Sequence, residues 1–478
     1  MNYSAVIYIL GWILNFEGFF LLFPCIVAII YREKTGVVFA GCMLLCLLLG
    51  AMAIHIGRKD KEFYAKEGLV TVSIGWIILS VFGALPFFLS GEIPFFEDAL
   101  FETISGFTTT GASILSDVEA LSKCSLFWRS FTHWVGGMGV LVFVLAVLPL
   151  AGGYNMHLMR AESPGPQVGK LVPKVRSTAM ILYGIYVFLT ALEVLLLLFG
   201  GMPLFDALTL SFGTAGTGGF SIKNDGLAGY TSYQQTIITV FMIICATNFN
   251  VYYFILMKKA KQILKLEEVM IFLGIILFSA LFITWDIRHL FSNLREAGHH
   301  ALFQVASILS TTGYSTTDFN VWPETAKTIL ILLMFTGGCA SSTSGGIKVS
   351  RMVICMKMLR KELSTFTHPK SVKSVHMEGR AIGQEVQFSV AVFVMTFAML
   401  FIISLFILTF NEFDFTTNFT AVATTLGNVG PGFAKVGPMD NFGKFSVLSK
   451  VVLMFNMLAG RLELFPILVL FYPKTWRK

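Results

Sequence analysis

Charged residues are scarce in this chain. Asp, Glu, Lys and Arg make up 13% of its 478 residues, whereas an ordinary soluble domain carries about 25%. Hydrophobic residues reach 55%, and the mean hydropathy is +0.75. This balance excludes a soluble globular protein and predicts a polytopic membrane protein. A membrane-spanning helix needs about 20 apolar residues, and the candidate spans are 3–30, 37–57, 68–90, 128–150, 179–200, 233–257, 268–288, 326–357 (interrupted), 384–410 and 446–472.

Motifs for enzymatic chemistry are also missing. The seven cysteines form no C-x-x-C pair and mostly lie in apolar segments, which indicates packing residues. No Gly-Lys-Ser/Thr sequence follows a glycine-rich stretch, so the chain has no Walker A loop. The histidines His133, His299 and His300 lack the spacing of a metal site. We therefore predict no enzymatic activity, no cofactor and no nucleic-acid partner.

The first apolar segment differs from a secretory signal peptide. Residues 1–30 have no basic n-region and no A-x-A cleavage site, and their apolar run is too long. We expect this segment to be retained as the first span.

Four short polar stretches interrupt the apolar sequence, each centred on a glycine. Such backbone at membrane depth is tolerated only where it is buried in protein or lines a water-filled path. Four equivalent copies in one chain therefore indicate a ring around one pore. The stretches are 105–113, 211–221, 307–315 and 423–431, and their aligned glycines are Gly111, Gly219, Gly313 and Gly430.

Each polar stretch follows a short amphipathic segment and lies between two spans. These segments, around 96–101, 204–208, 300–303 and 417–421, are too short to cross a bilayer. Each could enter from outside, stop partway as a pore helix and return as the Gly/Thr strand. The partially negative C-terminal end of such a helix would favour a cation at the centre of the membrane.

All copies have the same topology, which distinguishes them from the inverted repeats of rocking transporters. The predicted fold is an all-α polytopic membrane protein. It has four pseudosymmetric span–pore helix–span repeats around one central pore, plus two extra N-terminal transmembrane helices. The expected units are 1–62 (N-terminal addition), 63–153 (repeat 1), 154–178 (cytoplasmic connector), 179–260 (repeat 2), 261–365 (repeat 3, with a broken last helix) and 366–478 (repeat 4).

The polar stretches have the composition of a selectivity filter. A dehydrated cation needs oxygens in place of its water, and rings of backbone carbonyls provide them. Carbonyls that point one way require alternating signs of φ, and glycine adopts positive φ without steric cost. A single glycine shared by all copies suggests a short filter with modest discrimination of K⁺ from Na⁺. The predicted ion-binding residues are Thr109, Thr110, Gly111, Thr217, Gly218, Gly219, Thr311, Thr312, Gly313, Asn428, Val429 and Gly430.

The eighth span is broken by ten small or polar residues, 337–346, which cannot form a stable lipid-facing helix. They could form a kinked helix buried against its neighbours, or a flexible loop lying across the pore beneath the filter. In the second case the glycines at its two ends would act as hinges. These candidate gating glycines are Gly337, Gly338, Gly345 and Gly346.

Arg461 is the charged residue of interest in the last span. An unpaired guanidinium near the bilayer centre costs at least about 3 kcal/mol, so it should have a partner or face the pore. It could pair with Glu463, contact carbonyls, or place a positive charge below the filter that hinders cations. Near the outer mouth, Glu97, Asp98, Glu102 and Asp206 could concentrate cations or be ordinary solvated carboxylates.

This pattern resembles the Trk/Ktr/HKT superfamily of potassium transporters, most closely its TrkH/TrkG type, which also has two extra N-terminal spans. The resemblance covers essentially the whole chain, and the fourth copy, with Pro431 after its glycine, is the least similar. The segments that carry it are 105–113, 132–139, 217–221, 311–315 and 336–348.

The resemblance implies K⁺ uptake through a gated, channel-like pore, with K⁺ as the transported ion at the filter residues. It also implies an intramembrane gating loop at the broken span and an arginine at the position of Arg461. A homodimer and a cytoplasmic RCK-type nucleotide-binding regulatory subunit (TrkA-like) are the implied partners besides membrane lipid. The alternative is a Na⁺- or H⁺-coupled K⁺ symporter. The sequence shows no chain of buried carboxylates, which argues mildly against H⁺ coupling.

Basic residues predict the orientation in the membrane. With the N-terminus in the cytoplasm, the cytoplasmic loops hold about twice as many Lys and Arg residues as the outer loops, as expected from the positive-inside bias. We therefore expect a multi-pass protein of the cell (inner or plasma) membrane with both termini in the cytoplasm. The basic connectors 154–178 and 357–384 are candidate docking surfaces for the regulatory subunit.

Overall fold

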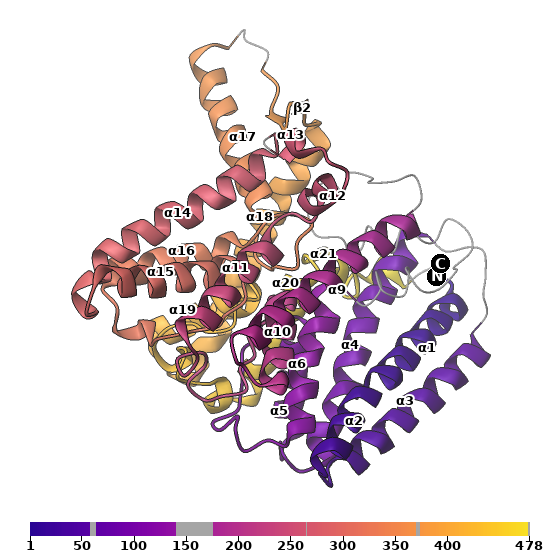
Figure 1. The fold of residues 1–478 in the computed structure, drawn as a ribbon. Coiled ribbons are helices and arrows are strands. Elements are labelled where there is room, and N and C mark those ends of the chain that lie inside the picture. Colours follow the sequence, from indigo (N-terminus) through magenta and orange to yellow (C-terminus); the bar gives the residue numbers. More distant parts are fainter. Residues whose placement is uncertain (58–63, 140–174, 264, 370–372, 477–478) are drawn as a thin grey trace.

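A computed structural model describes residues 1–57, 64–139, 175–263, 265–369 and 373–476. Helices make up almost all of the regular structure in these residues (Figure 1). A two-residue antiparallel pair, β1 (His376–Met377) and β2 (Arg380–Ala381), follows the helix that projects farthest from the body. Short 3-10 turns occupy Arg288–Leu290, Phe319–Val321, Thr409–Asn411, Ala434–Val436, Phe442–Lys444 and Pro473–Thr475.

The first three helices form the predicted N-terminal addition. They are α1 (Tyr3–Phe20), α2 (Leu22–Tyr31) and α3 (Gly36–Ile56). Helix α1 begins after Asn2, whose side chain accepts a hydrogen bond from the Ala5 N–H and so satisfies one free donor of the first turn. The three helices pack against one another and against the first repeat, outside the ring of pore helices. Helices α1 and α2 together form one candidate span (Tyr3–Tyr31) and α3 forms the other, so the two extra N-terminal spans are confirmed.

The rest of the chain repeats one arrangement four times: a long helix, a short pore helix and a second helix. Repeat 1 contains α4 (Ala65–Leu89), α5 (Phe96–Phe107) and α6 (Lys123–Gly137); repeat 2 contains α9 (Val175–Phe199), α10 (Leu204–Gly216), α11 (Ser232–Ala246), α12 (Asn250–Leu256) and α13 (Ala260–Ile263). Repeat 3 contains α14 (Glu267–Ile287), α15 (Leu294–Leu309), α16 (Glu324–Thr336) and α17 (Val349–Thr367); repeat 4 contains α18 (Gln384–Leu408), α19 (Phe415–Leu426), α20 (Val447–Arg461) and α21 (Phe465–Val469).

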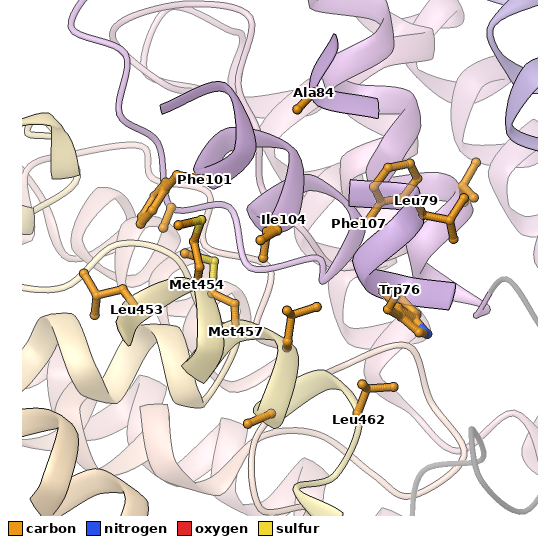
Figure 2. Close-up of a cluster of buried hydrophobic side chains, with 14 of the residues drawn as sticks. Trp76, Leu79, Ala84, Phe101, Ile104, Phe107, Leu453, Met454, Met457 and Leu462 are labelled. Atoms are coloured by element: carbon orange, nitrogen blue, oxygen red, sulfur yellow. The ribbon is translucent and has the colours of Figure 1, made fainter. Parts of the chain in front are cut away.

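The four repeats close into a ring. The second helix of each repeat packs on the pore helix of the next, in the pairs α6 with α10, α11 with α15, α16 with α19, and α20 with α5. Figure 2 shows the closing contact, where Phe101 and Ile104 of α5 face Met454 and Met457 of α20 in one buried apolar cluster. Residues far apart in the chain thus enclose a common axis, which the four-fold pattern in the sequence predicts.

Six helices, counted in the described residues, are long and apolar enough to cross a membrane, and the bent pair α11–α12 brings the number to seven. The predicted span 128–150 lies partly outside the described residues, as does most of the connector 154–178. The prediction of continuous spans over 233–257 and 446–472 is wrong. Helices α11 and α12 meet at 96°, and α20 ends at Arg461 before a reversal of the backbone.

These breaks have local physical causes. After α11, the side chain of Asn248 accepts a hydrogen bond from the Asn250 N–H at 3.0 Å and starts the new helix direction. After α20, Glu463 and Leu464 both adopt positive φ, at 55° and 67°, which a helix cannot continue through. The second helices of all four repeats therefore end near the polar stretches that follow the pore helices, whereas the sequence analysis placed a break only in the third.

The two chain ends lie close together (Figure 1), and the Tyr3 hydroxyl donates to the Trp476 carbonyl oxygen at 3.4 Å. Both ends are therefore on the same side of the molecule. Helix α17 projects from the body, and the β1–β2 pair lies beside it in the same view (Figure 1).

Candidate functional site: a four-strand ring and the loop against it

The four polar stretches have one backbone conformation. The residue two positions before each aligned glycine has a left-handed φ, at 54° for Thr109, 54° for Thr217, 58° for Thr311 and 52° for Asn428. Two residues later the aligned glycine again has positive φ, with values of 79° at Gly111, 76° at Gly219, 85° at Gly313 and 98° at Gly430. The residue between them has no positive φ, so the sign alternates as predicted. A left-handed threonine is uncommon because its branched side chain crowds the backbone, and the surrounding structure must hold it there.

The same turn joins each pore helix to its strand. In repeat 1 the Thr109 N–H donates to the Gly106 carbonyl and the Thr110 N–H to the Ser105 carbonyl. Equivalent pairs of bonds connect 217 to 214 and 218 to 213, 311 to 308 and 312 to 307, and 428 to 425 and 429 to 424. These bonds use the last free carbonyls of the pore helices, as in helix ends that terminate in a left-handed residue. The fourth stretch shares the geometry of the others despite Pro431.

The strands touch one another in cyclic order at their glycines. A Cβ atom on Gly111 would lie 2.0 Å from the Gly218 carbonyl oxygen, and one on Gly219 would lie 1.9 Å from that of Thr312. A Cβ on Gly313 would lie 2.2 Å from the Val429 carbonyl oxygen. On Gly430 it would lie 2.6 Å from the Thr110 carbonyl oxygen, which returns to the first strand. Each glycine is thus required by a carbonyl of the next strand as well as by its φ.

The side chains at the ring differ between repeats. The hydroxyls of Thr108 and Thr110 lie 2.8 Å apart, and those of Ser310 and Thr312 lie 2.7 Å apart. In repeat 4 the Asn428 amide nitrogen donates to the Thr110 hydroxyl at 2.9 Å, and so ties the last strand to the first. The backbone is therefore four-fold symmetric, while the side chains around it are only partly so.

A cavity of about 330 Å³ opens on one end of the ring and is lined by all four aligned glycines. Most of the rest of its wall consists of loop residues that follow the strands, joined by Arg129 of α6. The charged side chains among its lining residues are Arg129, Lys223, Asp225 and Asp440. We refer to this cavity as the vestibule.

Three of the four carboxylates that the sequence placed at the outer mouth have partners in the structure. Glu102 is 1% exposed and forms an ion pair with Arg129 at 2.5 Å. Asp98 pairs with Lys450, and Asp206 accepts a hydrogen bond from a tyrosine hydroxyl. The prediction that Glu102 is a free carboxylate at the outer mouth is therefore wrong. The residue is buried, and a buried charge requires a charged partner.

The broken span contains a loop and no kinked helix. Between α16 and α17, residues 337–346 leave helical geometry, and the two ends of the loop lie against each other. A Cβ on Gly337 would lie 2.3 Å from the Gly345 carbonyl oxygen, and one on Gly346 would lie 2.7 Å from the Gly337 Cα. We call this segment the crossing loop.

The crossing loop lies against the end of the ring opposite the vestibule. The Gly345 N–H donates to the Thr311 hydroxyl at 2.7 Å. A Cβ on Gly345 would also lie 2.5 Å from the Gly427 carbonyl oxygen, just before the strand of repeat 4. The loop thus directly contacts the ring at repeats 3 and 4.

Arg461 also contacts the crossing loop. Its guanidinium donates to the Thr343 carbonyl oxygen of the loop at 2.7 Å. It also donates to the carbonyl oxygens of Gly136 and Gly137 at the end of α6, the latter at 2.6 Å. Glu463, the alternative partner considered for Arg461, forms an ion pair with Arg351 instead. Arg461 therefore bridges the loop and the first repeat through carbonyl contacts.

Some residues at this site carried no clear signal in the sequence. His133 is fully buried, and its Nδ1–H donates to the Gly106 carbonyl at 2.7 Å while its Nε2 accepts from the Phe220 N–H at 3.1 Å. It joins the pore helix of repeat 1 to the strand of repeat 2, which is a structural role. Glu268, discussed below, was also missed. An acidic residue at the start of a span is a common helix-capping feature, so its sequence context does not distinguish it.

Comparison with known proteins gives consistent matches over the full length. A family model, TrkH, described as a cation transport protein, matches residues 35–478. The Trk system potassium uptake protein TrkH of Salmonella typhimurium is 36% identical, with 100% of both chains covered. The Trk system potassium uptake protein TrkG of Escherichia coli K12 is 31% identical over 99% of this chain and 98% of its own. The crystal structure of the potassium transporter TrkH from Vibrio parahaemolyticus superposes with a TM-score of 0.90 at 33% identity, covering 100% of both chains.

The fold and the ring define a multi-pass membrane transport protein built around a four-repeat pore. The matches then fix its family. The chain belongs to the TrkH family of cation transport proteins.

Proposed function

We propose that this protein carries K⁺ into the cell through a gated, channel-like pore whose filter consists of backbone carbonyls. The observation that carries the proposal is the closed ring of four strands with one shared backbone conformation. The relatives that span the whole chain are potassium uptake proteins, which supports K⁺ as the cargo.

In this proposal the ion sites are formed by the strands at 109–111, 217–219, 311–313 and 428–430. The carbonyls of Thr108–Thr110, Gly216–Gly218, Ser310–Thr312 and Gly427–Val429 replace the water around K⁺. The four pore helices end at these strands, and their partially negative C-terminal ends lower the energy of a cation there. The protein's contribution is therefore geometric and electrostatic, with no chemical step.

The gate in this proposal is the crossing loop together with Arg461. The loop lies against the filter end opposite the vestibule, and Arg461 places a positive charge beside it. Gly337, Gly338, Gly345 and Gly346 give the loop the backbone freedom to move aside. Its present contacts correspond to a closed pathway.

The remaining assignments rest on the resemblance and on charge. The protein resides in the cell membrane with both termini in the cytoplasm, forms a homodimer, and is controlled by an RCK-type nucleotide-binding subunit (TrkA-like). The close approach of the two chain ends supports the placement of both termini on the same side of the membrane. Arg360 and Lys361 of α17 are among the basic residues available for docking.

Coupled symport is the second candidate function. Glu17 of α1 is fully buried, and within the described part of the chain its carboxyl oxygens have no hydrogen-bond partner. Glu193 of α9 is fully buried as well. Intramembrane carboxyls are the groups that proton-coupled transporters use, so these two residues keep H⁺ coupling under consideration.

Uptake of radioactive rubidium into liposomes loaded with K⁺ tests the proposal. Gated diffusion predicts uptake that persists without Na⁺ and without a pH gradient. Uptake that requires Na⁺ or a proton gradient would favour symport, and Glu17→Gln and Glu193→Gln would then identify the coupling carboxyl. No uptake, even with the regulatory subunit present, would refute both candidates.

A further inference from the structure

Glu268 makes an unusual set of contacts for a residue at the start of a span. It is the second residue of α14 and is 2% exposed. One carboxylate oxygen accepts the Ala340 N–H at 2.7 Å and the Ser350 N–H at 3.0 Å. The other accepts from the Asn248 side-chain amide at 3.5 Å. Three donors from three different segments thus converge on one buried carboxylate.

These contacts connect the two sides of the crossing loop. Ala340 lies within the loop, whereas Ser350 lies in the first turn of α17, directly after it. The first N–H groups of a helix have no partner in the helix and favour a negative charge. An ionised carboxylate accepts but does not donate, and its hydrogen bonds are roughly twice as strong as neutral ones. Glu268 is therefore suited to hold the loop and the following helix in one fixed relation.

The crossing loop also packs against the break between α11 and α12. The Cys339 N–H donates to the Ala246 carbonyl at 3.0 Å, and the Thr343 hydroxyl donates to the Cys245 carbonyl at 3.1 Å. These carbonyls are free because α11 ends there and the chain turns by 96°. The break in repeat 2 therefore provides acceptors that a continuous helix would have used internally. Asn248, within the break, also contacts Glu268, so the break and the start of α14 are in direct contact.

We propose that Glu268 is a positioning residue that holds the crossing loop against the filter, within a cradle completed by the α11–α12 break. This rests on the proposed function, in which the loop is the gate. Loss of the carboxylate removes the acceptor of two backbone N–H groups and favours states in which the loop has left the filter. Transport would rise because more of the molecules are open, with no change in the filter itself.

The chain provides a matched control at the preceding position. Glu267 pairs with Lys357 of α17 at 2.5 Å, and its side chain is 37% exposed. It lies next to Glu268 on the same helix and carries the same charge, but its pair is on the partly exposed surface. Glu267→Gln therefore changes the charge of α14 without touching the loop contacts.

Cys339 is a built-in reporter of loop position. It lies in the crossing loop and is 0% exposed, so a thiol reagent reaches it only after the loop moves. The background for this experiment replaces the six other cysteines, Cys25, Cys42, Cys46, Cys124, Cys245 and Cys355. In that background, Glu268→Ala, Glu268→Gln and Glu267→Gln are compared in proteoliposomes for rubidium uptake and for reaction of Cys339 with N-ethylmaleimide.

For Glu268→Ala we expect uptake to rise about tenfold, which corresponds to a loss of about 1.4 kcal/mol of closed-state stabilisation, and Cys339 to become reactive. Glu268→Gln keeps one carbonyl acceptor and should fall between this variant and the wild type, which provides a result even if Glu268→Ala does not fold. Glu267→Gln should match the wild type in both measurements.

Unreactive Cys339 and wild-type uptake in the folded Glu268 variants would overturn the inference. The same would follow if Glu267→Gln had the same effect as Glu268→Gln, because charge alone would then explain it. Reactive Cys339 with unchanged uptake would support the cradle and refute the loop as gate, which separates this inference from the proposed function.

Discussion

At the residue scale, the four aligned glycines were predictable and their left-handed neighbours were not. Glycine in a polar run at membrane depth is a strong indication of a pore-lining or protein-buried backbone, because polar backbone is tolerated there in few other settings. Thr109, Thr217 and Thr311 are ordinary residues in the sequence, and a branched residue is not expected at positive φ. Their conformation is imposed by the turn at the end of each pore helix, which depends on packing that the sequence does not display.

Substitution of the ring glycines should have graded effects. A Cβ at Gly219 would meet a backbone carbonyl at 1.9 Å, whereas at Gly430 the nearest atom lies at 2.6 Å. Both positions also have positive φ, which costs an alanine roughly 1–2 kcal/mol. We expect Gly219→Ala to abolish rubidium uptake and Gly430→Ala to reduce it less. Gly184 has no atom within 4 Å of an added Cβ, so Gly184→Ala should transport like the wild type, and a similar loss there would contradict this account.

Arg461→Ala should increase cation flux. The guanidinium donates to the Thr343 carbonyl of the crossing loop and adds positive charge below the proposed filter. A barrier lowered by about 1.4 kcal/mol corresponds to a tenfold faster flux. The measurement is rubidium uptake at equal protein content. Arg461→Lys keeps the charge but loses the planar set of donors, so it should lie between alanine and wild type. Equal or lower flux in Arg461→Ala would count against a gating role.

At the scale of elements, the pore helices and the crossing loop follow from the sequence pattern, but most helix breaks do not. Residues 337–346 contain so many small and polar residues that no helix is expected there. The break after α11 follows an apolar run and depends on the side chain of Asn248, which accepts a hydrogen bond from the backbone N–H of residue 250. Asparagine in an apolar span is compatible with either a helix or a cap, and the tertiary contacts of the loop decide between them.

The buried ion pair between α5 and α6 should contribute strongly to stability. Arg129 and Glu102 are 3% and 0% exposed, and Arg129 also donates to the Ser221 carbonyl at 2.7 Å. Removal of one partner leaves a buried charge, which costs about 3–5 kcal/mol. We expect Arg129→Met to lower the thermal unfolding temperature in detergent markedly.

The exposed pair Lys327–Glu324, with 23% and 88% side-chain exposure, is the control for that experiment. Such pairs contribute about 0–1 kcal/mol, so Lys327→Met should leave the unfolding temperature nearly unchanged. Equal shifts in the two variants would contradict the structural role given to Arg129 and Glu102.

At the scale of the whole molecule, one backbone plan is used four times, and the differences between copies create the crossing loop that we propose as the gate. The repeats form a closed ring in which each second helix packs on the next pore helix. Repeat 3 alone, in the described part of the chain, has a ten-residue loop between the two halves of its broken helix that lies against the ring. The four-fold plan is visible in the sequence because the glycines recur, whereas the docking of the loop between repeats 2, 3 and 4 emerges only in the folded molecule.

The measurement that tests the central claim most directly compares wild type with Gly313→Ser in rubidium uptake by K⁺-loaded liposomes, with and without Na⁺. A Cβ at Gly313 would meet the Val429 carbonyl oxygen at 2.2 Å, so the serine must disturb the ring where two strands meet. This account predicts Na⁺-independent uptake by the wild type and its loss in the variant. Unchanged uptake by a folded Gly313→Ser protein would show that ions do not pass through this ring.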